Sequence, residues 1–238
     1  MIQLPLLDPH APDSFPDPRL ALEQPNGLLA FGGDLSVERL LAAYRRGIFP
    51  WYGEGEPILW WSPDPRCVFR TGRLKPNRSL RRQLAGKAWR VTVDHAFDDV
   101  IRACAAPRGD HMGTWLLPPM IDAYRQLHRL GHAHSVEVWD RDKLVGGIYG
   151  VAVGRLFCGE SMFSAESGGS KLALTTLARL LHERGYPLLD AQVANAHTLG
   201  LGAIEIPRGE FLQQVERLTA QPGHIGSWAA VDPACGLP

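Results

Sequence analysis

The stretch that most constrains the fold runs over residues 135–193, where the hydrophobic period changes from two to that of a helix and back again. Apolar and polar residues alternate over residues 135–139, 144–153 and 156–161, and short turns join these three segments. An amphipathic segment at 171–184 and an apolar run at 188–193 follow. We therefore predict a three-stranded antiparallel meander, then a helix, then one more strand of the same sheet.

Similar patterns predict the elements on either side. Helices are expected at residues 37–44, 97–104, 118–130 and 211–218, and short strands at 67–69 and 90–94. The fold class is α+β, or mixed α/β, with a central sheet flanked by helices. A boundary in the proline-containing segment 62–66 divides the chain into a small N-terminal domain, 1–64, and a larger domain, 65–238. The tail from residue 221 is rich in glycine and proline and is expected to be loosely held.

The composition excludes several classes of protein. With 45% hydrophobic residues it is that of an ordinary globular protein, and no apolar run approaches the ~20 residues that span a bilayer. The first twenty residues lack the basic region of a signal peptide. Four cysteines lie far apart without a CxxC motif, which favours a reducing cytoplasm. His132 and His134 are spaced to face the same way, but no third ligand matches them, so we expect structural histidines and no metal.

The charges are unevenly distributed although the net charge is zero. Residues 66–90 contain nine basic residues and no acid, so the rest of the chain is net acidic. A local basic field of this kind suits a partner with a phosphate backbone. The alternative is a solvated basic face without a partner. We favour nucleic acid, because the run lacks any compensating carboxylate.

Three polar side chains stand out in the predicted strands. Glu160 lies in an otherwise apolar strand, and a buried carboxylate is costly unless it serves a site or is paired, here with Lys171 or an arginine. Asp190 and Gln192 are two apart at a strand end. We therefore expect their side chains to point together into one space, with Ala191 turned away. The alternative is that this pair only ties down the strand end.

A glycine-rich turn from Gly168 to Lys171 opens the helix that follows the predicted meander. This is the place where acyl-CoA N-acetyltransferase folds hold a pyrophosphate, on backbone N–H groups at a helix N-terminus. Glu166 precedes the turn and would repel a pyrophosphate. The order of elements therefore indicates an acetyltransferase-like fold, but not coenzyme A.

Seven stretches of the sequence, in order, match a known family. They read PNGLLAFGGDLS, YRRGIFPWY, PILWWSPDPR, GTW, YRQLHRLGHAHSVEVW, LVGGIYGVAVGRLFCGESMFS and LLDAQVANAHTLGLGAIEIPR, and they are spread over about residues 15–208. The chain therefore resembles the leucyl/phenylalanyl-tRNA–protein transferases of bacteria. Because so many separate pieces match in the same order, chance is a poor explanation.

The resemblance implies an enzyme that moves leucine or phenylalanine, with methionine as a third candidate, from aminoacyl-tRNA to the N-terminal Arg or Lys of a protein. Its product carries a destabilising N-terminus and is marked for N-end rule degradation. The resemblance also implies a small N-terminal domain and an acetyltransferase-like (GNAT-like) C-terminal domain, with no cofactor and no metal. We expect a cytoplasmic monomer that does not bind a membrane.

The resemblance assigns catalytic roles to Asp190, Gln192 and Asn195. It gives the proton of the amine to Gln192, with Asp190 polarising Gln192. An amide carbonyl accepts a hydrogen bond but is a very weak base, so we expect Gln192 to aim the lone pair of the amine and Asp190 to hold the Gln192 amide. Asn195 either donates to the ester carbonyl or caps the turn. His197 either shuttles a proton or belongs to that turn.

The resemblance also points to residues that bind the substrates. Candidates for the apolar pocket and for stacking on the terminal adenine are Trp51, Trp115, Ile148, Phe157, Met162 and Phe163. Trp51 belongs to a proline-interrupted aromatic cluster at 51–61, which either fills a domain junction or lines a pocket. Glu160 would recognise the cationic N-terminal residue or orient the amine or the tRNA end. Ile148 stands where the family often has Met, which leaves the Leu-to-Phe preference open.

The basic run would grip the acceptor stem of tRNA through Arg78, Arg81, Arg82 and Lys87. Two other functions compete with the transferase. One is a related acyltransferase that uses acyl-CoA or builds peptide bridges in cell-wall precursors. The other is a non-catalytic tRNA-binding protein, which would keep the basic run but would have no use for Asp190 and Gln192.

Overall fold

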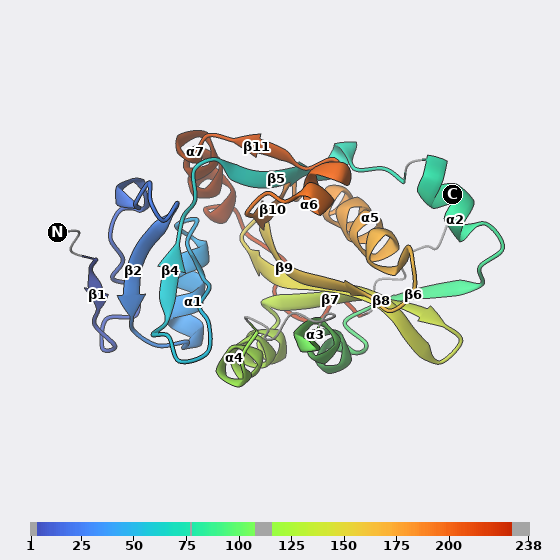
Figure 1. Ribbon diagram of the computed structural model, residues 1–238, viewed down its shortest axis with the longest axis horizontal. Coiled ribbons are helices and arrows are strands. Elements are labelled where there is room, and N and C mark those ends of the chain that lie inside the picture. The colour runs from blue at the N-terminus through green and yellow to red at the C-terminus, as the bar shows by residue number, and fades with distance from the viewer. Residues whose placement is uncertain (1–3, 77, 108–115, 230–238) are drawn as a thin grey trace.

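Two β-sheets lie side by side in the computed structural model, which describes residues 4–76, 78–107 and 116–229 (Figure 1). The first sheet has four strands in the order β1-β2-β4-β3. The second has seven, in the order β11-β5-β10-β9-β8-β7-β6. Helices pack on the second sheet, so the predicted α+β class with a central sheet flanked by helices is confirmed.

The smaller sheet is built from short strands. They are β1 (Leu6–Leu7), β2 (Leu28–Gly32), β3 (Phe49–Pro50) and β4 (Leu59–Trp61), and a 3₁₀ helix spans Pro18–Leu20. Helix α1 (Val37–Tyr44) begins where the hydroxyl of Ser36 accepts the N–H of Arg39 at 3.3 Å, and its bounds agree with the predicted helix at 37–44. Trp60 is fully buried and its indole N–H donates to the Gly32 carbonyl at 2.9 Å. Part of the aromatic cluster is therefore core.

The larger sheet contains the predicted meander. Its strands are β5 (Arg66–Arg70), β6 (Trp89–Val93), β7 (Ala133–Asp140), β8 (Lys143–Val153), β9 (Leu156–Ser164), β10 (Leu188–Gln192) and β11 (Ile204–Ile206). Strands β7, β8 and β9 are antiparallel, and β10 returns parallel to β9 after helix α5 (Gly169–Glu183). The meander, the helix and the added strand thus follow one another as predicted.

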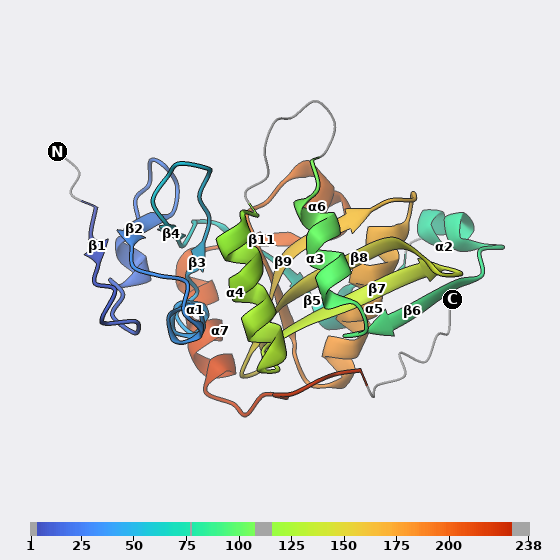
Figure 2. The ribbon, with the colours of Figure 1, turned by 90° about the horizontal axis from the view of Figure 1, so that it is seen from below.

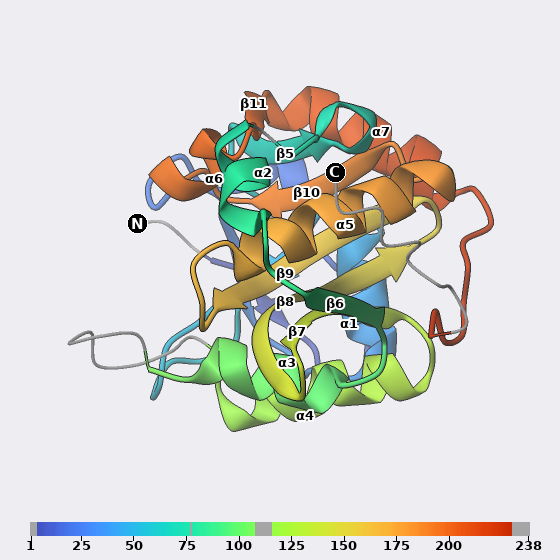
Figure 3. The same ribbon diagram turned by 90° about the vertical axis from the view of Figure 1, so that its right-hand side faces the viewer.

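Helices cover both faces of the larger sheet. Those on the larger part of the chain are α2 (Arg78–Leu84), α3 (Phe97–Ala105), α4 (Pro118–Arg129), α5, α6 (Ala196–Gly200) and α7 (Arg208–Thr219), and a 3₁₀ turn spans Thr71–Arg73. Helix α5 lies on one face, and α3 and α4 lie side by side on the other (Figures 2 and 3). Among the described helices, none has the length and apolar character to cross a membrane.

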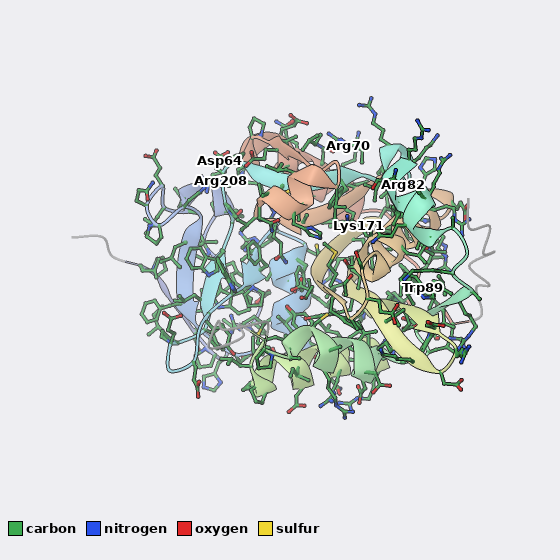
Figure 4. All side chains as sticks on the ribbon, turned by 45° about the vertical axis from the view of Figure 1, so that its right-hand side comes forward. Asp64, Arg70, Arg82, Trp89, Lys171 and Arg208 are labelled. Carbon is green, nitrogen blue, oxygen red and sulfur yellow. The ribbon has the colours of Figure 1, made fainter. Side chains whose placement is uncertain are left out.

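The two sheets share one hydrophobic core. A single buried cluster joins Leu40 and Trp60 of the N-terminal part to Tyr124 and Phe211 of α4 and α7. A second cluster lies between the other face of the sheet and α5. The chain passes from one sheet to the other over residues 62–65, where the carboxylate of Asp64 accepts the backbone N–H of Arg208 at 2.9 Å (Figure 4). The domain limits 1–64 and 65–238 remain predictions.

The end of the described chain is packed, so the expectation of a loosely held tail is wrong for residues 221–229. Trp228 is only 2% exposed, and its ring stacks on His134 with 3.7 Å between centroids. Its backbone N–H donates to Asp94, which also accepts a hydrogen bond from His134. The buried ring of Trp228 and the hydrogen bond from its N–H to Asp94 hold this segment in place, although the segment is rich in glycine and proline.

A bulge in β9 decides which of its side chains face which core. Ser161 pairs with Tyr149 and Gly159 with the next residue, Gly150, so Glu160 is the extra residue of the strand. The alternation therefore shifts by one beyond Glu160. Met162 packs against the cluster under α5, and Phe163 packs against the opposite cluster.

Candidate active site

A pocket of about 870 Å³ opens where β9 and β10 separate. The two strands pair in parallel up to Asp190 and Cys158, and beyond that point side chains of both strands line the cavity. The start of α5, the start of α6 and the residues after β3 complete the wall. The N-terminus of α5 reaches this wall because Gly169 lies directly on β8, where a Cβ atom would approach the Val145 carbonyl to 2.4 Å.

One end of the pocket is apolar. Ile148, Met162, Leu174, Leu189 and Phe69 line it, and all but Met162 are at most 4% exposed. They come from the two strands, from β5, from β8 and from α5, so the walls are rigid elements rather than loops. This end can take an aliphatic or aromatic side chain of moderate size. Ile148 and Met162 are thus placed together, as the sequence analysis expects.

The other end of the pocket holds the carboxylate of Glu160. Its Oε1 accepts hydrogen bonds from the Tyr44 hydroxyl at 2.8 Å and from Nε2 of Gln192 at 3.0 Å. Its Oε2 accepts one from the Tyr124 hydroxyl at 2.6 Å. Within the described residues no lysine or arginine forms an ion pair with it, so the alternative of a pair with Lys171 or an arginine is wrong.

The absence of a described cation beside Glu160 bears on the pKa of its carboxyl group. Burial raises the pKa of Glu160 to about 7, although the two tyrosine hydroxyls lower that pKa. The pKa values of Tyr44 and Tyr124 are raised well above their ordinary value, first by burial and then by the charge of Glu160. Both phenols therefore remain protonated donors, and Glu160 changes its charge near neutral pH.

Asp190 lies behind the pocket rather than in it. Its two oxygens accept from Nε and Nη2 of Arg66 at 2.8 and 2.7 Å, and both side chains are only 1% exposed. The guanidinium of Arg66 is also stacked between the rings of Phe49 and Phe211, 4.8 and 4.5 Å from their centroids. Arg66 therefore does not belong to the exposed basic surface, although its sequence position in the basic run suggests that it does.

The prediction that the side chains of Asp190 and Gln192 share one face of the strand is wrong. The register of β10 against β5 shifts between them, and Gln192 has a φ of 61°, in the left-handed region that non-glycine residues rarely adopt. As a result Ala191 and Gln192 both line the pocket, while Asp190 points away from it. Asp190 holds Gln192 through its backbone, whose N–H donates to Oδ1 at 2.9 Å. Glu160 holds the side-chain amide instead.

Asn195 performs the capping role that the sequence analysis gives as one alternative. Its Oδ1 accepts the backbone N–H of Thr198 at 2.9 Å, and the Thr198 hydroxyl accepts the N–H of Asn195 at 3.0 Å. Asn195 also lines the pocket, and its Nδ2 has no hydrogen-bond partner among the described residues. It can therefore cap α6 and still donate into the cavity. His197 is exposed at the same rim.

The aromatic candidates divide into three groups. Trp51 lines the pocket mouth, is 44% exposed, and lies beside Trp61 with 5.7 Å between ring centroids. Phe157 is fully buried against Trp228 and does not line the pocket, and neither does Phe163. Trp115 lies outside the described residues.

The predicted tRNA-binding residues lie on α2 and just after it. Arg78, Arg81 and Arg82 are exposed and form no ion pair within the described residues. Lys87 pairs with Glu166 at 3.3 Å. The amide of Gln83 on the same helix donates to the hydroxyl of Ser167, which lines the pocket. Because Ser167 lines the pocket, this exposed basic helix borders the cavity. Figure 4 shows Arg82 on α2 and Lys171, which also lines the pocket, at the start of α5.

Sequence reasoning missed three residues of the site. Tyr44 and Tyr124 lie in two of the predicted helices, 37–44 and 118–130, and no role in the site was expected for them, yet their hydroxyls hold Glu160. Arg66 was counted with the surface charges. A single arginine opening an apolar strand and a single aspartate in another are a usable signal, because buried charges occur in pairs. No group of three or more possible metal ligands occurs in the described ranges.

Comparison with known proteins decides the family. A model of the leucyl/phenylalanyl-tRNA protein transferase family matches residues 68–216, and a model of that family's N-terminal domain matches residues 33–64. The chain belongs to the leucyl/phenylalanyl-tRNA–protein transferase family. The resemblance that the seven sequence stretches indicate is thus confirmed, and the chain is an aminoacyltransferase.

Relatives of the same name cover nearly the whole chain. The leucyl/phenylalanyl-tRNA–protein transferase of Xanthomonas euvesicatoria is 60% identical over 217 residues, 91% of this chain and 87% of the relative. That of Yersinia enterocolitica is 57% identical over 90% of each chain. That of Alkalilimnicola ehrlichii is 53% identical over 96% of this chain and 89% of its own. A crystal structure of FemX has 11% identity and a TM-score of 0.45 over 76% of this chain and 71% of its own, and supports no conclusion on function.

Proposed function

We propose that this chain transfers leucine or phenylalanine from aminoacyl-tRNA to the N-terminal Arg or Lys of a protein, with methionine as a third donor. The observation that carries the proposal is a pocket with an apolar end and a hydrogen-bonded carboxylate–amide pair at the other. The donor side chain fills the apolar end, and the ester lies beside Gln192. The family name, which joins leucyl/phenylalanyl-tRNA to protein, supports this choice of donor and acceptor.

The reaction is aminolysis of an ester that is already activated. The protein has to hold two substrates, present a neutral amine and stabilise the oxyanion that forms. An N-terminal amine has an unperturbed pKa of about 7.7–8, so part of it is neutral at physiological pH. No nucleotide or coenzyme is required for this chemistry.

Gln192 and Asn195 meet these needs from one side of the pocket. Because Nε2 of Gln192 is held by Glu160, its Oε1 is left to accept a hydrogen bond from the amine and aim the lone pair. The free Nδ2 of Asn195 can donate to the carbonyl oxygen of the ester. Asp190 contributes by holding the backbone of Gln192 in its strained conformation, and Arg66 holds Asp190.

The terminal adenine and the acceptor stem of the tRNA would lie outside the apolar end of the pocket. The exposed ring of Trp51 at the pocket mouth suits stacking on the terminal adenine. The unpaired arginines of α2 suit the phosphates of the acceptor stem. We further propose a monomer, because Leu6 and Leu20, two of the most exposed large apolar side chains, lie in the N-terminal part, whereas Leu130 and Ile225 lie next to the paired backbones of Gly131 and Gly226. We also propose a cytoplasmic location, because the proposed donor is an aminoacyl-tRNA.

The direct test is transfer of radiolabel from Leu-tRNA to a peptide that begins with Arg. We expect label on this peptide and on one that begins with Lys, but none on a control peptide that begins with Ala. Phe-tRNA should serve as donor, and Ile-tRNA should be poor because its β-branched side chain is stiff. Binding of Leu-tRNA without transfer would leave only a tRNA-binding protein. Transfer from an acyl-CoA would favour the other acyltransferase.

A second prediction concerns the basic helix α2. Replacing Arg78, Arg81 and Arg82 together with alanine should weaken tRNA binding and reduce the salt dependence of log Kd by about two to three units. The control is Arg102→Ala with Arg129→Ala, two exposed arginines on α3 and α4. Filter binding between 50 and 300 mM salt measures both. Equal slopes for the wild type and the triple variant would make the run a solvated surface.

A further inference from the structure

The pocket needs a group that removes a proton from the attacking amine. After the amine nitrogen attacks the ester carbon, it carries a positive charge and a proton that must leave. Of the described side chains that line the pocket, only Glu160 and His197 can accept a proton, since Lys171 is a cation and Gln192 is an amide. Asp190 is excluded, because both of its oxygens are bonded to Arg66 behind the wall.

We propose that Glu160 is the general base of the transfer reaction and returns the proton to the departing ribose oxygen. The proposal rests on the proposed function, and it assigns Glu160 a proton-transfer role in place of recognition of the cationic residue. The geometry supports it in two ways. Glu160 is the bulged residue that β9 pushes into the pocket, and it is bonded directly to Gln192, which aims the amine.

The step balances without any other reactant. The amine nitrogen forms the new C–N bond, and the carbonyl oxygen takes the displaced electron pair. Glu160 then removes one proton from the nitrogen. When the tetrahedral intermediate collapses, the C–O bond to the ribose breaks and the ribose oxygen receives that proton from Glu160. The carboxylate is thereby regenerated, and the products are a peptide bond and a free tRNA hydroxyl.

The surroundings of Glu160 suit a group that both takes and gives a proton. Burial raises its pKa to about 7, near the pH at which it works, which is the condition for an efficient acid–base catalyst. The ionisable groups that face it are Tyr44 on α1, Tyr124 on α4, Tyr149 on β8, Cys158 on β9, Asp190 on β10 and Arg66 on β5. Asp190 raises its pKa and Arg66 lowers it, so the two members of this ion pair act in opposite directions.

The position of Glu160 argues against a purely structural role. It lines the pocket, and it holds the amide of Gln192, which lines the pocket as well. Glu137 on β7 provides the comparison. It is fully buried, accepts hydrogen bonds from Thr92 and Ser135, and lies outside the pocket. Glu137 is therefore the matched control for any substitution at Glu160.

The test compares Glu160→Gln with Glu137→Gln in the Leu-tRNA transfer assay. We expect Glu160→Gln to lower kcat about 10²- to 10⁴-fold while tRNA affinity stays within about threefold of the wild type. Below pH 7, log kcat/KM of the wild type should rise with a slope of about two, because both the amine and Glu160 must lose a proton. The slope should fall to about one in Glu160→Gln and remain about two in Glu137→Gln.

Tyr44→Phe provides a second readout, for the case in which Glu160→Gln is disturbed in its folding. The Tyr44 hydroxyl donates to Glu160 and lowers its pKa, so its removal should move the acidic limb of the wild-type profile to higher pH. If Glu160→Gln keeps the wild-type kcat, or loses activity with an unchanged slope, the base assignment is wrong. It is equally wrong if only KM for the peptide rises, or if His197→Gln removes one unit of slope. In each of these outcomes the wild type still transfers leucine, so the proposed function stands.

Discussion

Replacing Arg66 with methionine should lower the free energy of unfolding by about 3–5 kcal/mol, because the change leaves Asp190 charged and buried without a counterion. Methionine replaces only the stem of Arg66, so the space that the guanidinium fills between Phe49 and Phe211 and the lost hydrogen bond to the Gly47 carbonyl add to the cost of the unpaired charge. Transfer should also fall sharply, since Asp190 no longer holds the N–H of Gln192 in place. Urea unfolding followed by tryptophan fluorescence measures the stability, and the Leu-tRNA assay measures the activity.

Two further variants separate the effects of the Arg66–Asp190 pair. Arg102→Met removes an exposed arginine with carboxylate neighbours and should cost at most about 1 kcal/mol. Arg66→Met with Asp190→Leu replaces the buried ion pair by apolar side chains and should recover much of the stability. It should not recover transfer, because the Gln192 N–H then lacks its acceptor. Recovered transfer in this double variant would show that the reaction does not depend on Asp190.

The sequence predicts the framework of the site well, because local periodicity determines it. The meander, α5 and β10 follow from alternation and helical spacing, and these elements bring Ile148, Glu160, Met162 and Gln192 to one cavity. Asn195 follows directly from the end of β10. Each of these positions depends on neighbours a few residues away in the chain, which is the range that pattern analysis covers.

The details that decide the chemistry depend on contacts that no local pattern contains. The two bulges, at Glu160 in β9 and between Asp190 and Gln192 in β10, reverse the expected alternation. They explain why Asp190 points away from the pocket and why Phe163 does not line it. Arg66 and Asp190 are 124 residues apart in the chain, so their pairing is a property of the assembled sheet.

The bulge in β9 places Glu160 in a buried position, and we expect this position to cost stability while it serves the reaction. Its pKa is about 7 in the folded protein and 4.5 in an ordinary environment, so folding favours the protonated form. The stability that this group contributes is therefore fully present below pH 4.5 and is lost as the pH rises through 7. Glutamine does not ionise and loses nothing over this range.

The free energy of unfolding of Glu160→Gln, relative to the wild type, should accordingly rise by about 2–3 kcal/mol between pH 5 and 8. Urea unfolding at several pH values measures this difference. Burial also raises the pKa of Glu137, so Glu137→Gln should show a gain of the same sign while transfer is retained. A constant difference for Glu160→Gln from pH 5 to 8 would mean that the Glu160 carboxylate ionises as readily in the folded protein as in water. A rising difference with lost transfer would show that the protein retains a destabilising charge at Glu160 because the reaction requires it.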